Sequence, residues 1–161
     1  MDSCFRPRLL VLLGLASCGQ GGLQQATPAN RVILPASTAR EVLDQCSRAV
    51  PSTMDGTWEP TDSDINAMEA ILPRVLASHP EARQVDFSDL LKGWQRQYVG
   101  TVRGGKRFVY GNYFPISDTN EMVGWREQPM IVCDGGPQFF GAEFDISAKR
   151  ITRIDFNGSI G

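Results

Sequence analysis

Histidine is scarce in this chain of 161 residues. The chain has one histidine, His79, and no Gly-x-Ser-x-Gly pattern, so a Ser–His–Asp triad with a nucleophile elbow is not expected. A single histidine also argues against a zinc site, and no Cys-x-x-Cys spacing indicates a redox centre. We therefore assign no catalytic residue, no metal ligand and no cofactor.

Excess positive charge and long apolar runs are also missing. The formal net charge is −2, and no basic stripe marks a surface for nucleic acid. No apolar run approaches the roughly 20 residues that a membrane-spanning helix needs. These absences argue against a nucleic-acid partner and against a transmembrane helix.

The N-terminal residues have the layout of a secretion signal. Basic side chains precede a short apolar run over residues 9–15, and small residues follow it. The run ends in Leu15-Ala16-Ser17-Cys18, which resembles the lipobox of bacterial lipoproteins. The resemblance implies a signal peptide cut before Cys18 and acylation of Cys18 with palmitate-type chains, several of which together give stable anchoring. An ordinary cleaved signal and an incidental cysteine are the alternatives.

The same resemblance implies a location in the bacterial cell envelope. Gly19 follows the cysteine, where the enterobacterial signal for inner-membrane retention has Asp. The expected location is therefore the outer membrane, facing the periplasm. The expected partners are the membrane, through the lipid anchor, and an envelope protein or glycan.

Two cysteines remain after the N-terminal ones are set aside. Cys4 lies in the signal peptide and Cys18 carries the lipid, which leaves Cys46 and Cys133. A pair of this kind in an oxidising compartment predicts a disulfide. Two buried free thiols and a reactive pair are the alternatives.

Composition divides the chain into three parts. Residues 1–17 form the signal peptide, residues 18–36 form the lipidated cysteine and a flexible tether rich in Gly, Gln and Pro, and residues 37–161 form one globular domain. Two helical patterns open the domain. The first begins at a capping-box sequence at Thr38 and the second begins at Thr61, with an expected kink or split at Pro73.

After these helices the pattern changes to strands separated by glycine-rich turns. The expected strands are residues 98–103 and 106–114 around Gly104-Gly105, residues 130–134 and 138–145 around Gly135-Gly136-Pro137, and residues 150–157. Helices followed by hairpins predict an α+β domain. Its two N-terminal helices pack on an antiparallel sheet of about five strands.

Two groups of residues are candidates for a binding surface. One is the turn at Asp134, Gly135 and Gly136 with Phe139 beside it, since glycine turns can bring the main chain close to a partner. The other is the aromatic hairpin, represented by Tyr110 and Trp125, because aromatic side chains occur on both of its faces. The alternative for the second group is that the segment around Trp125 or the tether covers the second face.

These observations predict a membrane-anchored binding module that is not an enzyme. A first alternative is a small periplasmic hydrolase or glycan-acting enzyme that uses the strand carboxylates of Glu143, Asp145 and Asp155. Against it stands the commoner role of such a face, in which the carboxylates are solvated and pair with Arg153 across strands. A second alternative is an inhibitor of a lytic enzyme that presents the Asp134–Pro137 turn as a rigid loop.

Overall fold

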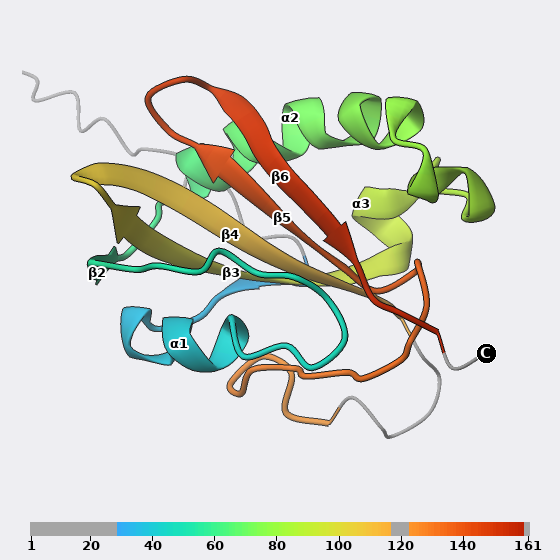
Figure 1. Ribbon diagram of the computed structural model, residues 1–161, viewed down its shortest axis with the longest axis horizontal. Coiled ribbons are helices and arrows are strands. Elements are labelled where there is room, and N and C mark those ends of the chain that lie inside the picture. Colours follow the sequence, from blue (N-terminus) through green and yellow to red (C-terminus); the bar gives the residue numbers. More distant parts are fainter. Residues whose placement is uncertain (1–28, 117–122, 160–161) are drawn as a thin grey trace, which may run out of the picture.

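The computed structural model describes residues 29–116 and 123–159 (Figure 1). The predicted signal peptide, Cys18 and residues 18–28 of the predicted tether lie outside these residues. In chain order the elements are β1 (Arg31–Ile33), η1 (Ala36–Thr38), α1 (Ala39–Val42), β2 (Gly56–Trp58), α2 (Asp62–Ser78), η2 (Glu81–Gln84), α3 (Leu90–Gly93), β3 (Trp94–Arg103), β4 (Lys106–Pro115), β5 (Phe140–Asp145) and β6 (Arg150–Phe156). Within the described residues, no helix combines the length and apolarity needed to cross a membrane.

The strands form one mixed sheet of six strands with a few helices, which is an α+β or mostly β architecture. The order is β1-β3-β4-β5-β6, and β2 pairs with another part of β3. β1 runs parallel to β3, whereas every other pair is antiparallel. The predicted sheet of about five antiparallel strands is therefore wrong in this respect. The predicted hairpin at Gly104-Gly105 is present, and both glycines adopt positive φ angles, of 56° and 73°.

β1 and β2 were not predicted because each is only three residues long, too short for an alternating pattern to stand out. β1 pairs Arg31–Ile33 with Arg96–Tyr98. Leu34, directly after it, is buried. Residues 31–36, which composition assigns to the tether, thus belong to the folded domain.

The predicted strand over residues 130–134 is wrong. This segment is irregular, and side-chain amides take the place of a neighbouring strand. Gln97 accepts from the N–H of Met130, Asn112 donates to the carbonyl of Met130, and Asn157 donates to the carbonyl of Val132. Because buried backbone groups need partners, these three amides allow the segment to lie on the sheet without becoming a strand.

Each face of the sheet carries its own apolar cluster. One combines side chains of α2 with β3–β6: Ile65, Met68, Leu72, Leu76, Tyr98, Val109, Tyr113, Phe140, Ala142, Phe144 and Phe156. The other combines Ala39, Val42 and Leu43 of the α1 region with Leu34, Val99 and Tyr110. In Figure 1 the sheet accordingly separates α2, above it, from α1, below it.

The two predicted helix starts differ in their capping. At Thr61 the capping box is complete, because the Thr61 hydroxyl accepts from the Asp64 N–H and the Asp64 carboxylate accepts from the Thr61 N–H. α2 then continues through Pro73 without the expected split. Thr38 makes no capping bond, and its hydroxyl donates to the carbonyl of Pro35 instead. α1 lasts a single turn, Ala39–Val42.

This difference predicts unequal effects of the same substitution. We expect Thr61→Ala to lower the free energy of unfolding by about 1 kcal/mol, the usual loss for a removed N-cap. The matched control is Thr38→Ala, for which we expect a change within about 0.5 kcal/mol. Urea unfolding of both variants measures the difference. Equal losses would show that the Thr61 cap does not stabilise α2.

Candidate functional site

The Asp134–Pro137 turn is attached to the domain on several sides and does not protrude. The N–H of Asp134 donates to the Ser47 hydroxyl, and the N–H of Gly136 donates to the carbonyl of Gly158. Asp134 is exposed and has a φ of 58°, a left-handed conformation that Asp tolerates better than most residues. The expected hairpin between two strands is therefore absent, and with it the protruding loop on which the inhibitor alternative depended.

The other predicted residues of this turn have packing roles. A Cβ atom on Gly135 would lie 2.4 Å from Cδ2 of Phe139, so this glycine is needed where the half-buried ring covers the backbone. Gly136 is buried and has a φ of 71°. Turn geometry and the Phe139 ring thus account for both glycines. Of these predicted binding residues, Asp134 alone has a largely exposed side chain.

The predicted disulfide between Cys46 and Cys133 is confirmed. It joins the loop that follows α1 to the irregular segment before the turn, across a sequence separation of 87 residues. Both cysteines are exposed, and so is Ile131 close by. The Gln45 amide adds a second link, because it donates to the carbonyls of Val42 and Met130. Two surface segments are thus held together by a covalent bond and by hydrogen bonds.

Arg48 lies directly beneath this linked region and is only 8% exposed. Its guanidinium donates to the Tyr110 hydroxyl at 3.2 Å, to Asn157 Oδ1 at 2.9 Å and to Asn112 Oδ1 at 2.6 Å. Gly141 makes room for this network, since a Cβ there would lie 2.1 Å from the Tyr110 oxygen. Burial raises the pKa of the Tyr110 hydroxyl, and the charge of Arg48 acts in the opposite direction.

Tyr110 is therefore not a surface residue, contrary to the prediction. Its side chain is 1% exposed and belongs to the apolar cluster on the α1 face. Trp125 is half-buried, and its ring meets Phe114 edge to face at 6.1 Å. The structure thus favours the alternative in which the segment around Trp125 covers the second aromatic face. Arg48, which sequence analysis did not single out, is the residue that organises this face, and its position two residues after Cys46 was the available signal.

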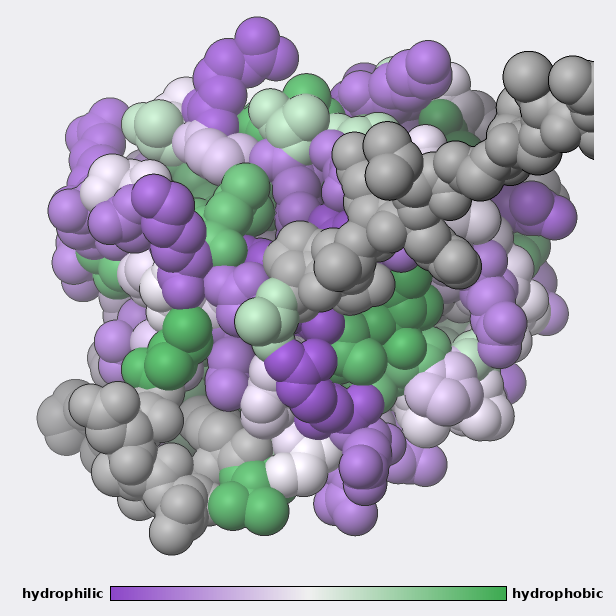
Figure 2. All heavy atoms as spheres, turned by 180° about the vertical axis from the view of Figure 1, so that it is seen from behind, coloured by the Kyte–Doolittle hydropathy of each residue, from purple (hydrophilic) through white to green (hydrophobic). Residues whose placement is uncertain are grey.

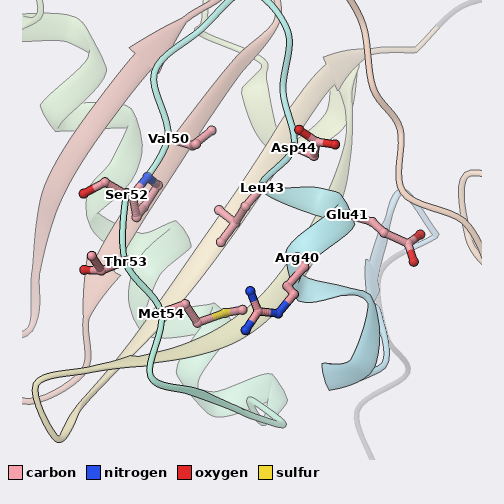
Figure 3. A pocket seen from close by; sticks show the side chains of 9 residues that line it. Arg40, Glu41, Leu43, Asp44, Val50, Ser52, Thr53 and Met54 are labelled. Carbon is pink, nitrogen blue, oxygen red and sulfur yellow. The ribbon is translucent and has the colours of Figure 1, made fainter.

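A groove lies beside α1. It has a volume of about 430 Å³ and lies between α1 and the loop over residues 50–54. Its lining combines the apolar side chains of Leu43, Val50, Pro51 and Met54 with Arg40, Glu41, Asp44, Ser52 and Thr53. Figure 3 shows Met54 reaching from the loop toward Arg40, whereas Glu41 points away from the loop. The groove therefore combines apolar with polar side chains, and its charged residues lie on the helix side.

The strand carboxylates of the enzyme alternative are already engaged within the chain. Glu143 is 2% exposed, forms two hydrogen bonds with the Arg103 guanidinium and accepts a third from Thr152. Asp145 accepts from the N–H of Ala148 in the following turn. None of these carboxylates lines the groove beside α1. Their contacts explain them as structural groups that stabilise β5 and its neighbours.

Asp155, the third of these carboxylates, pairs with Arg153 on its own strand. Arg153 thus pairs within its own strand and not across strands as expected, and Glu143 and Asp145 are buried instead of solvated. In the part of the chain that the structure describes, no three His, Cys, Asp or Glu side chains are grouped as a metal site.

Elsewhere the surface is mixed in character. On the side opposite to the view of Figure 1, hydrophobic atoms form separate patches among hydrophilic ones (Figure 2). A second cavity, of about 380 Å³, lies between the C-terminal part of α2 and residues 82–88. None of the predicted binding residues lines this cavity.

Comparisons of the chain with protein-family models, with curated proteins and with solved structures find no match. The function of the domain is therefore inferred from its own residues.

Proposed function

We propose that this chain is a lipid-anchored lipoprotein of the bacterial envelope whose domain binds a protein or glycan partner and catalyses no reaction. In this proposal the two N-terminal helices pack on the sheet, and the groove beside α1 is the centre of the binding surface. The observation that carries the proposal is the Cys46–Cys133 disulfide, in which Cys46 comes two residues after Asp44 of this groove. Disulfides form in oxidising compartments, and the proposed location in the cell envelope is such a compartment.

The membrane anchor in this proposal is Cys18. The resemblance of Leu15-Ala16-Ser17-Cys18 to a lipobox supports acylation at this residue, and Gly19 supports the outer membrane. Asn30, directly before β1, already bonds to Leu91 and Arg96 of the domain, so residues 19–29 connect the anchor to the domain. On this basis the domain faces the periplasm.

The binding surface consists of the groove beside α1 together with Ile131 and Asp134. The disulfide, the Gln45 amide and the bond from the Asp134 N–H to Ser47 link the two parts. A surface held in this way loses little conformational entropy when a partner binds, because its loops are already ordered. Its mixture of apolar and polar side chains also occurs in recognition sites.

The experiment that tests this proposal is site-specific photocrosslinking of the full chain in envelope membranes. A photoreactive residue at Glu41 or at Ser52 lies on the groove, whereas one at Ala70 lies on the exposed side of α2 and is the matched control. We expect a discrete crosslinked product from the two groove positions and none from Ala70. A protein partner gives a sharp band of higher mass, and a glycan partner gives a product that muramidase digestion shortens.

The same membranes test the anchor. We expect the wild-type chain to enter the detergent phase in Triton X-114 partition and Cys18→Ser to remain in the aqueous phase. Aqueous partition of the wild type would overturn the anchor. Absence of product from the groove positions, or equal products from Ala70, would overturn the binding surface. A hydrolytic activity retained by the purified chain and lost in Glu143→Gln, with folding unchanged, would favour the enzyme alternative.

A further inference from the structure

Among residues 29–116 and 123–159, no strand pairs with the outer edge of β6. β6 is the last strand in the sheet order, and none of the backbone hydrogen bonds between the described residues reaches the outer side of Arg150–Phe156. A free strand edge presents a row of unpaired N–H and C=O groups that can pair with another chain. The side chains of β6 determine which kind of chain can pair with this edge.

The backbone hydrogen bonds between β5 and β6 show which backbone groups of β6 point away from the sheet. The N–H of Asn157 donates to the carbonyl of Phe139, in register with the β5–β6 pairs. Because bonded positions alternate along an antiparallel strand, Arg153 and Asp155 bond inward to β5. The N–H and C=O of Ile154 and Phe156 therefore point outward. Ile154 lies at the middle of this outer row.

The charges on β6 are arranged to match a second copy of the same strand. Arg153 and Asp155 are two residues apart, so their side chains share one side of the sheet, where they form an ion pair. Their side chains are 38% and 22% exposed. If two β6 strands run antiparallel with Ile154 opposite Ile154, each Arg153 lies opposite Asp155 of the second copy. Both cross-strand pairs then join opposite charges.

The neighbouring registers are excluded by the same charges. The outward N–H and C=O groups of Ile154 must lie opposite outward backbone groups of the second copy. Because such groups occur at every second residue, the register of the two strands can shift only in steps of two residues. A shift in one direction places Arg153 opposite Arg153, and a shift in the other places Asp155 opposite Asp155. Like charges directly opposite each other destabilise a strand pair. The register centred on Ile154 also puts the charged residues at non-hydrogen-bonded positions, where side chains of the two strands are closest.

We infer that two copies of this chain associate through their β6 edges, antiparallel and with Ile154 on the two-fold axis. The pairing joins the two sheets into one continuous sheet. The same residues of β6 form the interface in both copies, as a two-fold interface requires. The inference depends on β6 alone and stands or falls separately from the groove and from the lipid anchor.

Charge exchange provides the test, with the mature full-length chain in density-matched detergent. Sedimentation equilibrium gives the dimer dissociation constant of the wild type, of Arg153→Asp and of Asp155→Arg. Each single variant places like charges opposite each other in both pairs, and we expect its dissociation constant to rise at least about tenfold. An equimolar mixture of the two variants again pairs opposite charges, and we expect it to form heterodimers with an affinity near that of the wild type.

Two controls separate this effect from misfolding. The double variant Arg153→Asp with Asp155→Arg restores both the ion pair within the strand and the cross-strand pairs, and it is expected to dimerise like the wild type. Arg83→Asp, on the exposed surface of η2, changes the charge in the same way and is expected to have no effect. A monomeric wild type, a dimer that is insensitive to the single exchanges, or a mixture that stays monomeric would overturn the inference.

Discussion

Replacing Glu69 with glutamine is expected to lower the free energy of unfolding by about 3 to 5 kcal/mol. Glu69 is 7% exposed and lies between two buried arginines. Its Oε2 is 2.9 Å from Nη1 of Arg31, its Oε1 is 3.1 Å from Nε of Arg96, and it also accepts from the Tyr98 hydroxyl at 2.7 Å. Without the carboxylate, two guanidinium groups stay buried without the anion between them, which accounts for the size of the expected loss.

The position of β1 makes this cluster important for the fold. β1 has three residues and lies at an edge of the sheet, so its ladder to β3 provides few hydrogen bonds. Arg31 compensates by joining β1 to α2 through Glu69 and through the Asn66 side chain at 2.7 Å. We therefore expect Glu69→Gln also to increase hydrogen exchange in β1.

Asp62→Asn is the matched control for Glu69→Gln. The Asp62 carboxylate also contacts Arg31, at 2.7 Å, but its side chain is 49% exposed. Exposed ion pairs contribute little, so we expect a loss below about 1 kcal/mol. Urea unfolding compares the two variants under the same conditions. Equal decreases in the free energy of unfolding would show that burial between the arginines does not make Glu69 more stabilising than Asp62.

The second large effect is expected for the disulfide. Replacing both Cys46 and Cys133 with serine is expected to lower the free energy of unfolding by about 4 to 5 kcal/mol, the chain-entropy value for a loop of this length. The bond closes a loop across 87 residues, which contains α2, β3 and β4. Its removal increases the number of conformations open to the unfolded chain. The double substitution is used because a single one would leave a reactive thiol.

Reduction of the wild type checks this expectation without a substitution. Added dithiothreitol should lower the stability of the wild type to that of the double variant and leave the double variant unchanged. A loss below about 1 kcal/mol in the double variant would show that the native state is strained by the bond or that the unfolded chain stays compact without it.

Several local features were predictable because neighbouring residues determine them. Thr61 and Asp64 satisfy each other's backbone N–H groups, so the start of α2 is determined by four consecutive residues. Gly104-Gly105 supplies the positive φ angles of a tight turn between two alternating strands. Two remaining cysteines allowed only one pairing, and the structure has it.

Other features were not predictable because distant residues decide them. The irregular segment at residues 130–134 has a strand-like sequence, yet amides from three separate strands or strand ends satisfy its backbone. Tyr110 has the pattern of an exposed aromatic face, yet Arg48, 62 residues earlier in the chain, covers it. The acidic strand has the pattern of a charged surface, yet Arg103 and Thr152 enclose Glu143.

The sequence by itself determined that a sheet is combined with helices, and it determined the hairpin at Gly104-Gly105, the beginning of α2 and the disulfide. It also carries the lipobox resemblance, which remains a prediction. Caps, turns and alternation are short-range properties, which neighbouring side chains settle through backbone angles and local hydrogen bonds. The tertiary structure alone decided the parallel β1, the buried Arg48 network and the groove beside α1. Burial depends on which distant segments cover a residue, and no local pattern contains that information.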